Sequence, residues 1–175
     1  MTIGPASEAA VDHLSGRDFM RIDLVFIGRT AFGDLESAID RYVERLRHYC
    51  PVEIHYIKAE KIAAAAGDHL VRERESERIL KLAGRRGHLI VLDQGGRELD
   101  STGLAKLMEK LRASAISGLW IAVGGPVGVS PRLLKSAHDV LSLSKMTLPH
   151  DLVRLILVEQ LYRAFTIIKG EPYNR

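Results

Sequence analysis

The stretch Leu141-Ser-Leu-Ser-Lys-Met-Thr-Leu-Pro-His150, which leads into a helical pattern over residues 151–165, decides the fold of this chain. A second stretch, Ile121-Ala-Val-Gly-Gly-Pro-Val-Gly128, lies a short way upstream. In both, a short apolar strand ends in a loop of small or polar residues. Backbone groups at such strand ends are where an α/β sheet usually receives a ligand. We therefore predict a binding site between these two loops.

The rest of the chain alternates between strand-like and helix-like patterns. Short apolar or alternating runs predict strands at residues 21–28, 52–58, 88–93, 119–123 and 140–144. Apolar residues at three- and four-residue steps predict helices between them and a last helix over residues 150–168. We expect Asp34, Ser101 and Ser130 to cap three of these helices, with Pro131 in the first turn of the third. This alternation predicts a mostly parallel α/β sheet with helices on both faces.

Length and composition place the chain among ordinary globular domains. Its 175 residues, 46% of them hydrophobic, suffice for one core without disulfides or metals. We expect residues 20–175 to form a single domain and residues 1–19, which carry no packing pattern, to be a disordered extension. The net charge of +3 permits a polyanionic partner but does not require one.

Cysteine and histidine usage argues against disulfides and metals. Cys50 is the only cysteine, so no intrachain disulfide can form and a reducing intracellular setting fits best. The seven histidines show none of the short spacings typical of metal ligands, so no metal is expected. No apolar stretch approaches a membrane span, and the N-terminus lacks the regions of a secretory signal. We therefore expect a cytoplasmic protein without a membrane partner.

The two loops lack the signatures of common phosphate-binding motifs. No Lys-Ser/Thr follows Gly124-Gly-Pro-Val-Gly128, and Pro126 stands in the place of the second glycine of the dinucleotide fingerprint. Gly124 and Gly125 would allow the backbone to approach a flat ligand closely. The loop at residues 143–148 has no acidic side chain, and its Met and Leu bulk suits an adenine ring and a thioether-like chain. Each loop is equally compatible with a purely structural connection.

The last helix is apolar on nearly all sides, which predicts that a second copy of the chain covers part of it. We interpret His150, at its start, as a structural residue pushed toward neutrality, with a general base as the alternative. Glu159 and Arg163, four residues apart, predict an intrahelical ion pair. The charged run at residues 72–78 is interpreted as a solvated helix face, with RNA contact as the alternative.

Both loops and the terminal Pro172-Tyr-Asn-Arg175 follow one another in an order and spacing that resemble the RlmH family of ribosomal large-subunit methyltransferases. The resemblance covers residues 20–175. That family belongs to the SPOUT superfamily of knotted, S-adenosylmethionine-dependent enzymes. The resemblance implies that the last helix is tucked through the preceding loop in a trefoil knot, a feature that topology rules alone would not predict.

The resemblance also implies a reaction, which is methyl transfer from S-adenosylmethionine to N3 of pseudouridine 1915 in 23S rRNA. A homodimer would act on assembled ribosomes without a metal. The residues implied to line the cofactor pocket are Leu92, Gly124, Gly125, Leu143, Ser144, Lys145, Met146, Thr147 and Leu148.

The resemblance assigns further residues to catalysis and to RNA. Those implied to hold and polarise the target base are Tyr173 and Arg175, with Asn174 and His150 as further candidates. Those implied to contact RNA are Arg154, and as further candidates Arg29, Arg85 and Arg86.

One position departs from the family, since Asn174 stands where a histidine is usual. A carboxamide cannot accept the imide proton of the target base, so that histidine is not available as a base here. Two alternative functions follow: a ribosome-associated RNA-binding protein with weakened turnover, or a knotted methyltransferase that acts on tRNA. The intact cofactor loops argue against the first, and the lack of an appended RNA-binding domain argues against the second.

Overall fold

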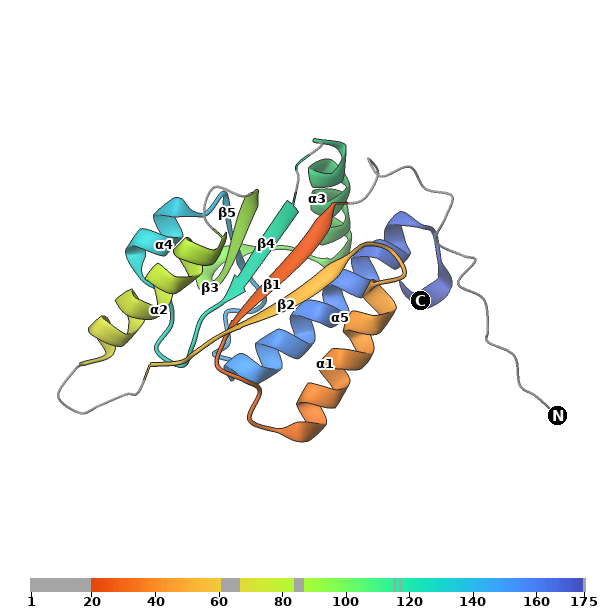
Figure 1. The fold of residues 1–175 in the computed structure, drawn as a ribbon. Coiled ribbons are helices and arrows are strands. Elements are labelled where there is room, and N and C mark those ends of the chain that lie inside the picture. The colour runs from red at the N-terminus through yellow and green to blue at the C-terminus, as the bar shows by residue number, and fades with distance from the viewer. Residues whose placement is uncertain (1–19, 61–66, 84–86, 115, 117, 175) are drawn as a thin grey trace, which may run out of the picture.

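A five-stranded parallel sheet forms the centre of the molecule (Figure 1). The computed structural model describes residues 20–60, 67–83, 87–114, 116 and 118–174, so the expected extension at residues 1–19 lies outside the described residues. The strands are β1 (Arg21–Ile27), β2 (Val52–Ile57), β3 (His88–Glu98), β4 (Gly118–Val123) and β5 (Asp139–Ser142). Their order is β2-β1-β4-β3-β5, and every neighbouring pair is parallel.

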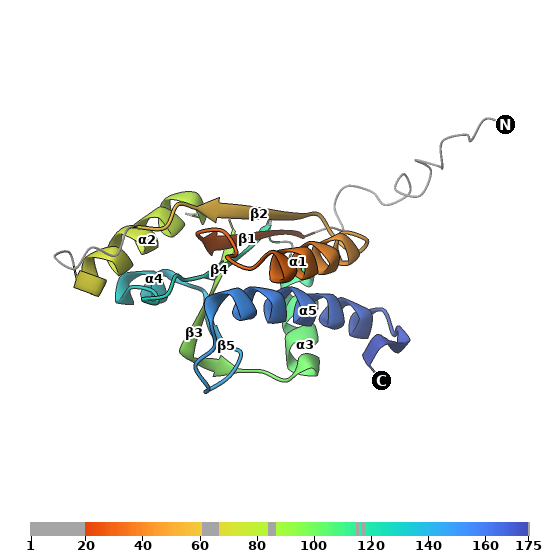
Figure 2. The ribbon, with the colours of Figure 1, turned by 90° about the horizontal axis from the view of Figure 1, so that it is seen from below.

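Helices cover both faces of this sheet. They are α1 (Gly33–Leu46), α2 (Gly67–Ala83), α3 (Ser101–Ala113), α4 (Pro131–Ser136) and α5 (His150–Ile168), followed by the short 3-10 turn η1 (Pro172–Asn174). Helices α1, α3 and α5 pack on one face and α2 and α4 on the other (Figure 2). The predicted α/β fold is confirmed.

The side-chain period of two along β1 creates two separate cores. Leu24 and Phe26 are fully buried in the core under α1, α3 and α5. Val25 and Ile27 point to the opposite face and are buried in the core under α2 and α4. A strand buried on both faces reads as a continuous apolar run, which is why β1 was predictable from sequence.

Two of the three predicted helix caps are wrong, and one is confirmed. Helix α1 begins at Gly33, after Phe32, so Asp34 lies inside the first turn and does not cap it. Helix α3 is capped by Asp100, whose Oδ1 accepts a hydrogen bond from the Gly103 amide at 2.6 Å. Ser130 caps α4 as predicted, accepting from the Leu133 amide.

Because Asp100 caps α3, the hydroxyl of Ser101 is available for a contact with another helix. Ser101 Oγ donates to Gln160 Oε1 of α5 at 2.7 Å. Asp100 and Ser101 are both good capping residues, so the contact with α5 selects between them.

Strand β3 extends beyond its predicted end. We expected it to stop before Gln94-Gly-Gly96, yet after a bulge it continues with Arg97 and Glu98 paired to β5. Gly96 lies so close to β5 that an added Cβ would stand 2.6 Å from the Leu141 carbonyl carbon. The glycine therefore permits a close approach of two strands, which periodicity could not indicate.

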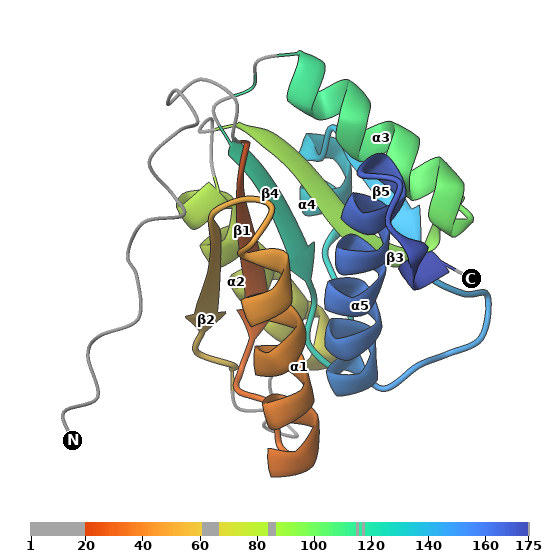
Figure 3. The ribbon, with the colours of Figure 1, turned by 90° about the vertical axis from the view of Figure 1, so that its right-hand side faces the viewer.

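Helix α5 lies between α1 and α3 on the sheet (Figure 3). Leu157, Val158 and Leu161 are buried in this layer. Leu152 is 37% exposed, and Leu155 and Ile156 are only partly buried. An apolar strip of α5 thus remains on the outside of the single chain. No helix among the described residues is long and apolar enough to cross a membrane.

Candidate ligand-binding site

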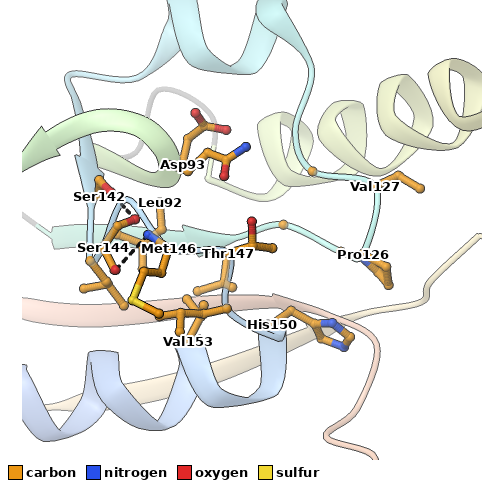
Figure 4. Close-up of a pocket in the computed structure, with 17 residues that line it drawn as sticks. Leu92, Asp93, Pro126, Val127, Ser142, Ser144, Met146, Thr147, His150 and Val153 are labelled. Atoms are coloured by element: carbon orange, nitrogen blue, oxygen red, sulfur yellow. Dashed lines mark hydrogen bonds between the residues drawn. The ribbon is translucent and has the colours of Figure 1, made fainter.

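A cavity of about 300 Å³ opens at the carboxyl ends of β3, β4 and β5 (Figure 4). Strand β3 lies between β4 and β5, so the loop after β4 and the loop after β5 meet on either side of its end. The predicted residues that line the cavity are Leu92, Gly124, Gly125, Leu143, Ser144, Met146, Thr147 and Leu148. The two quoted loops therefore do enclose a common space.

The loop after β4, residues 124–130, is hereafter the glycine loop. It closes on itself through a hydrogen bond from the Gly128 amide to the Gly125 carbonyl at 3.0 Å. Gly128 has a φ of +78°, in the left-handed region that favours glycine. Pro126 and Val127 of this loop also line the cavity, and Figure 4 shows them on the opposite side of the view from Ser142 and Ser144.

The first two glycines of the loop are also needed for packing within the protein. A Cβ at Gly124 would stand 2.7 Å from Val129 Cγ1 and would also crowd Gly128. A Cβ at Gly125 would stand 2.7 Å from Glu75 Oε2. Both obstacles belong to the protein. The glycines are therefore required by packing around the loop, in addition to any approach of a ligand.

The loop after β5 is held by its own serines. Ser142 Oγ donates to the Ser144 carbonyl at 3.0 Å, and Ser144 Oγ accepts from the Met146 amide at 2.9 Å. These bonds set the turn that carries Met146 and Thr147 to the cavity (Figure 4). Met146 is 75% exposed, so it forms a flexible apolar rim.

The bulge of β3 adds two polar groups that sequence reasoning missed. Asp93 and Gln94 line the cavity, and Asp93 Oδ1 accepts from the Gly95 amide at 2.8 Å. Their position at a strand end before two glycines was a usable signal. Asp93 is the one carboxylate among the residues that line the cavity, and its negative charge favours a ligand with a positive charge.

His150 and Val153 of the first turn of α5 complete the cavity (Figure 4). Burial lowers the pKa of His150, while the neighbouring Asp151 opposes and Arg154 reinforces this shift. The imidazole is therefore neutral near pH 7 and able to accept a proton. It does not cap α5, since Pro149 occupies the cap position without a side-chain hydrogen bond.

Comparison with known proteins identifies this architecture. The family described as predicted SPOUT methyltransferase matches residues 20–174. This chain belongs to the SPOUT methyltransferase family. A ribosomal RNA large subunit methyltransferase H from Syntrophobacter fumaroxidans is 53% identical over 157 residues, covering 89% of this chain and 100% of the relative.

Further relatives agree with the assignment to the SPOUT family. A protein with the same description from Geobacter sp. strain M21 is 41% identical over 155 residues, covering 89% of this chain and 99% of its own. The solved structure of a probable methylase family protein from Haemophilus influenzae Rd KW20 superposes with a TM-score of 0.52 at 12% identity. It covers 85% of this chain and 66% of that chain, and the likeness concerns the fold.

Arg154 of this SPOUT chain does not lie where we predicted. The side chain is fully buried, with Nη2 donating to the Ile27 carbonyl at 2.5 Å and Nη1 3.1 Å from Asp151 Oδ1. Its guanidinium lies over the Phe26 ring at 5.2 Å. This burial contradicts the predicted RNA contact, because a side chain without accessible surface cannot reach a phosphate.

Asp151 joins the same arrangement from the other side. Its Oδ2 accepts from the Ala31 amide at 3.0 Å, and Arg154 Nη1 donates to Thr30 Oγ1 at 3.3 Å. The pair fastens the loop after β1 to the first turn of α5. Arg154 therefore helps to place His150 at the cavity.

The tail of the SPOUT domain packs at the other end of α5 (Figure 3). Tyr173 donates to Glu159 Oε1 at 3.2 Å and meets the Tyr42 hydroxyl at 3.2 Å. Burial, together with Tyr42 and Glu159, raises the pKa of Tyr173, so the phenol stays protonated. The predicted pair of Glu159 and Arg163 is confirmed at 2.6 Å. The structure describes no side chain for Asn174, and Arg175 lies outside the described residues.

Tyr173 and the cavity are separated within one chain. Glu159, which Tyr173 contacts, follows His150 by nine positions, or about 14 Å along a helix that rises 1.5 Å per residue. Within a single chain the tail and the cavity are therefore too far apart to form one site.

The remaining predicted residues are accounted for as follows. Lys145 does not line the cavity; its ammonium lies 3.9 Å from Glu98. Arg29 is exposed and lies over the Tyr56 ring at 4.7 Å, so it is accessible to a partner. Arg85 and Arg86 lie outside the described residues.

One cluster of potential metal ligands escaped sequence analysis, since it is assembled from two adjacent strands. Ligand atoms of Asp23, Glu53 and His55 lie within 4.8 Å of one another. The buried Asp23 already accepts from His55 at 2.8 Å and from Arg21 at 2.9 Å. The positive guanidinium of Arg21 opposes a cation there, so the carboxylate of Asp23 serves contacts within the protein.

The Cys50 thiol is unreactive, because burial raises its pKa to about 12.

Proposed function

We propose that this chain methylates N3 of pseudouridine 1915 in 23S rRNA with S-adenosylmethionine as the methyl donor, acting on assembled ribosomes in the cytoplasm. The observation that carries the proposal is the cavity at the ends of β3, β4 and β5 in a SPOUT methyltransferase domain. The relatives described as rRNA large-subunit methyltransferases, matched over their whole length, support rRNA as the substrate.

The residues of the cavity fit this methyl donor. Apolar walls from Leu92, Val127 and Leu148 suit the adenine ring, and backbone groups of the two loops suit its polar edge. The Asp93 carboxylate would pair with positive charge on the methionine moiety. When bound there, the donor supplies an electrophilic methyl group on a sulfonium, whose sulfur keeps the electron pair of the broken bond.

The target nitrogen carries a proton that must leave for the transfer to balance. His150 is the one histidine among the residues that line the cavity, and its lowered pKa keeps it neutral, so it is our candidate to accept that proton. Asp151, next to it, would stabilise the imidazolium that forms. Asn174 cannot take this role, and this strengthens the case for His150 in this chain.

A homodimer would bring the tail of one chain next to the cavity of the other. Tyr173 and Arg175 are proposed to hold the target base, yet the tail of one chain lies at the far end of α5 from its own cavity. A second copy packed on the outer apolar strip of α5 would bring its tail to the cavity of the first. The trefoil knot of the superfamily is proposed for the loop after β5 and α5.

Mass spectrometry of rRNA tests the proposal. Ribosomes from cells that lack the gene should carry unmethylated pseudouridine at position 1915, and purified protein with S-adenosylmethionine should restore the methyl group. A methyl group that persists in the deletion strain would refute the proposal. Loss of a methyl group from tRNA instead would identify a tRNA methyltransferase, and binding to ribosomes without transfer would identify the RNA-binding protein.

A further inference from the structure

One face of helix α2 holds the glycine loop from behind. Arg72, Glu75 and Ser76 are three and four residues apart, so they share this face. Arg72 Nε donates to the Val127 carbonyl at 2.8 Å. Ser76 Oγ accepts from the Ser130 amide at 2.8 Å in a buried hydrogen bond. The middle of the glycine loop, at Val127, and its last residue, Ser130, are thus tied to α2.

Glu75 lies on the same face of α2, against Gly125 near the start of the loop. It is only 2% exposed, and its Oε1 accepts from the Glu60 amide at 2.9 Å. Its Oε2 has no hydrogen-bond partner among the described residues and lies where a side chain at Gly125 would stand. A buried carboxyl oxygen without a partner is costly, so its retention calls for a reason.

Helix α2 is itself fastened to the end of β2. Arg78 Nη1 donates to the Lys58 carbonyl at 2.7 Å, and Arg78 also pairs with Glu60. Because Glu60 bonds Glu75 in turn, the contacts run without a break from the edge of the sheet to the glycine loop. The charged run at residues 72–78 is therefore partly an internal brace, contrary to our interpretation of it as a solvated face.

We infer that Arg72, Glu75 and Ser76 are positioning residues that preorganise the glycine loop for the methyl donor. This inference rests on the proposed function, in that it names what the loop is ordered for. Three glycines within five residues make the loop entropically costly to order. Contacts that order it before the ligand arrives remove that cost from binding. Val127 bonds Arg72 through its carbonyl and also lines the cavity. Loss of the contact with Arg72 would therefore directly loosen a residue that lines the binding site.

The size of the effect follows from the bond removed. One hydrogen bond contributes on the order of 0.5–1.5 kcal/mol, which corresponds to about a 2- to 10-fold change in a dissociation constant. Arg72→Met keeps the apolar stem and removes the donor to Val127. We expect it to weaken S-adenosylmethionine binding by about 5-fold and to raise KM for the donor while kcat is kept. Arg72→Lys, which restores a donor, should recover part of the affinity.

Arg74→Met is the matched control. Arg74 lies on the same helix and is exposed, and among the described residues it pairs with Glu60 at 3.5 Å and makes no hydrogen bond to the loop. Both variants lose one arginine and the same charge. Calorimetry with S-adenosylmethionine and hydrogen exchange of the loop amides, measured on the ligand-free full chain, should therefore separate them.

The outcomes are decisive in each direction. Weaker binding and faster exchange of the amides of residues 124–130 in Arg72→Met, but not in Arg74→Met, would support the inference. Equal dissociation constants in the two variants, or a lower melting temperature in Arg72→Met with unchanged affinity, would overturn it. If the wild-type protein does not bind S-adenosylmethionine, the proposed function fails. Hydrogen exchange of the loop amides then tests separately whether α2 orders the glycine loop. Equal exchange rates in Arg72→Met and Arg74→Met would refute that ordering.

Discussion

Replacing Arg154 by methionine tests whether this arginine is a structural residue of the interior. Methionine keeps an apolar stem but removes the guanidinium that lies over Phe26. It also leaves the carboxylate of Asp151, which is 4% exposed, without its ion pair to Arg154. Removing one partner of a buried pair costs on the order of 3–5 kcal/mol. For a chain of this size each kcal/mol lowers Tm by about 2–4 °C, so Tm should fall by about 6–20 °C.

The control is Arg97→Met. Arg97 pairs with Asp139 at 3.4 Å and its side chain is 58% exposed, so its loss should cost about 0–1 kcal/mol. The double variant Asp151→Asn with Arg154→Met removes the stranded charge and keeps an acceptor for the Ala31 amide. It should recover a large part of the loss, which a double-mutant cycle in urea would measure.

The same variants decide between a buried and an RNA-binding Arg154. We measure unfolding in urea and, separately, the affinity for ribosomes at one salt concentration. If Arg154→Met is as stable as Arg97→Met and yet binds ribosomes more weakly, then Arg154 reaches RNA. The reasoning from burial would then be wrong.

Three further predictions concern the loop, its buried acid and the tail. Gly125→Ala should destabilise the protein by about 1–3 kcal/mol through the clash with Glu75, whereas Gly33→Ala, with no atom within 4 Å among the described residues, should be neutral in the same thermal melts. Burial raises the pKa of Glu75, so the stability it confers is present below the ordinary glutamate pKa of about 4.3 and is lost as pH rises through its raised folded value. Glu75→Gln should therefore be more stable than wild type at pH 7 and equal to it near pH 4, and the opposite trend in urea titrations would show that the acid is ionised and satisfied. Deleting residues 173–175 should nearly eliminate methylation of ribosomes and leave calorimetric affinity for S-adenosylmethionine unchanged; a loss of both would place the tail in the cofactor pocket.

Local pattern was sufficient for the elements and for the place of the cavity. A strand buried on both faces, such as β1, is a continuous apolar run, and Ser130-Pro131 marks a helix start, because these signals depend only on neighbouring residues. The two loops could be placed together because parallel strands present their carboxyl ends at one edge of a sheet. The extension of β3 to Glu98 was missed, since its continuation through a bulge depends on pairing with β5.

The amino-acid sequence by itself therefore determined the succession of strands and helices, the two loops that line the cavity and the membership of the SPOUT family. Only the tertiary structure decided what each polar residue contacts. Arg154 is buried against Ile27, and Arg72 is turned toward the glycine loop, although sequence alone favoured RNA for one and solvent for the other. The physical reason is that periodicity reports which face of an element is buried, whereas the partner of a charged side chain comes from a segment far away in the chain.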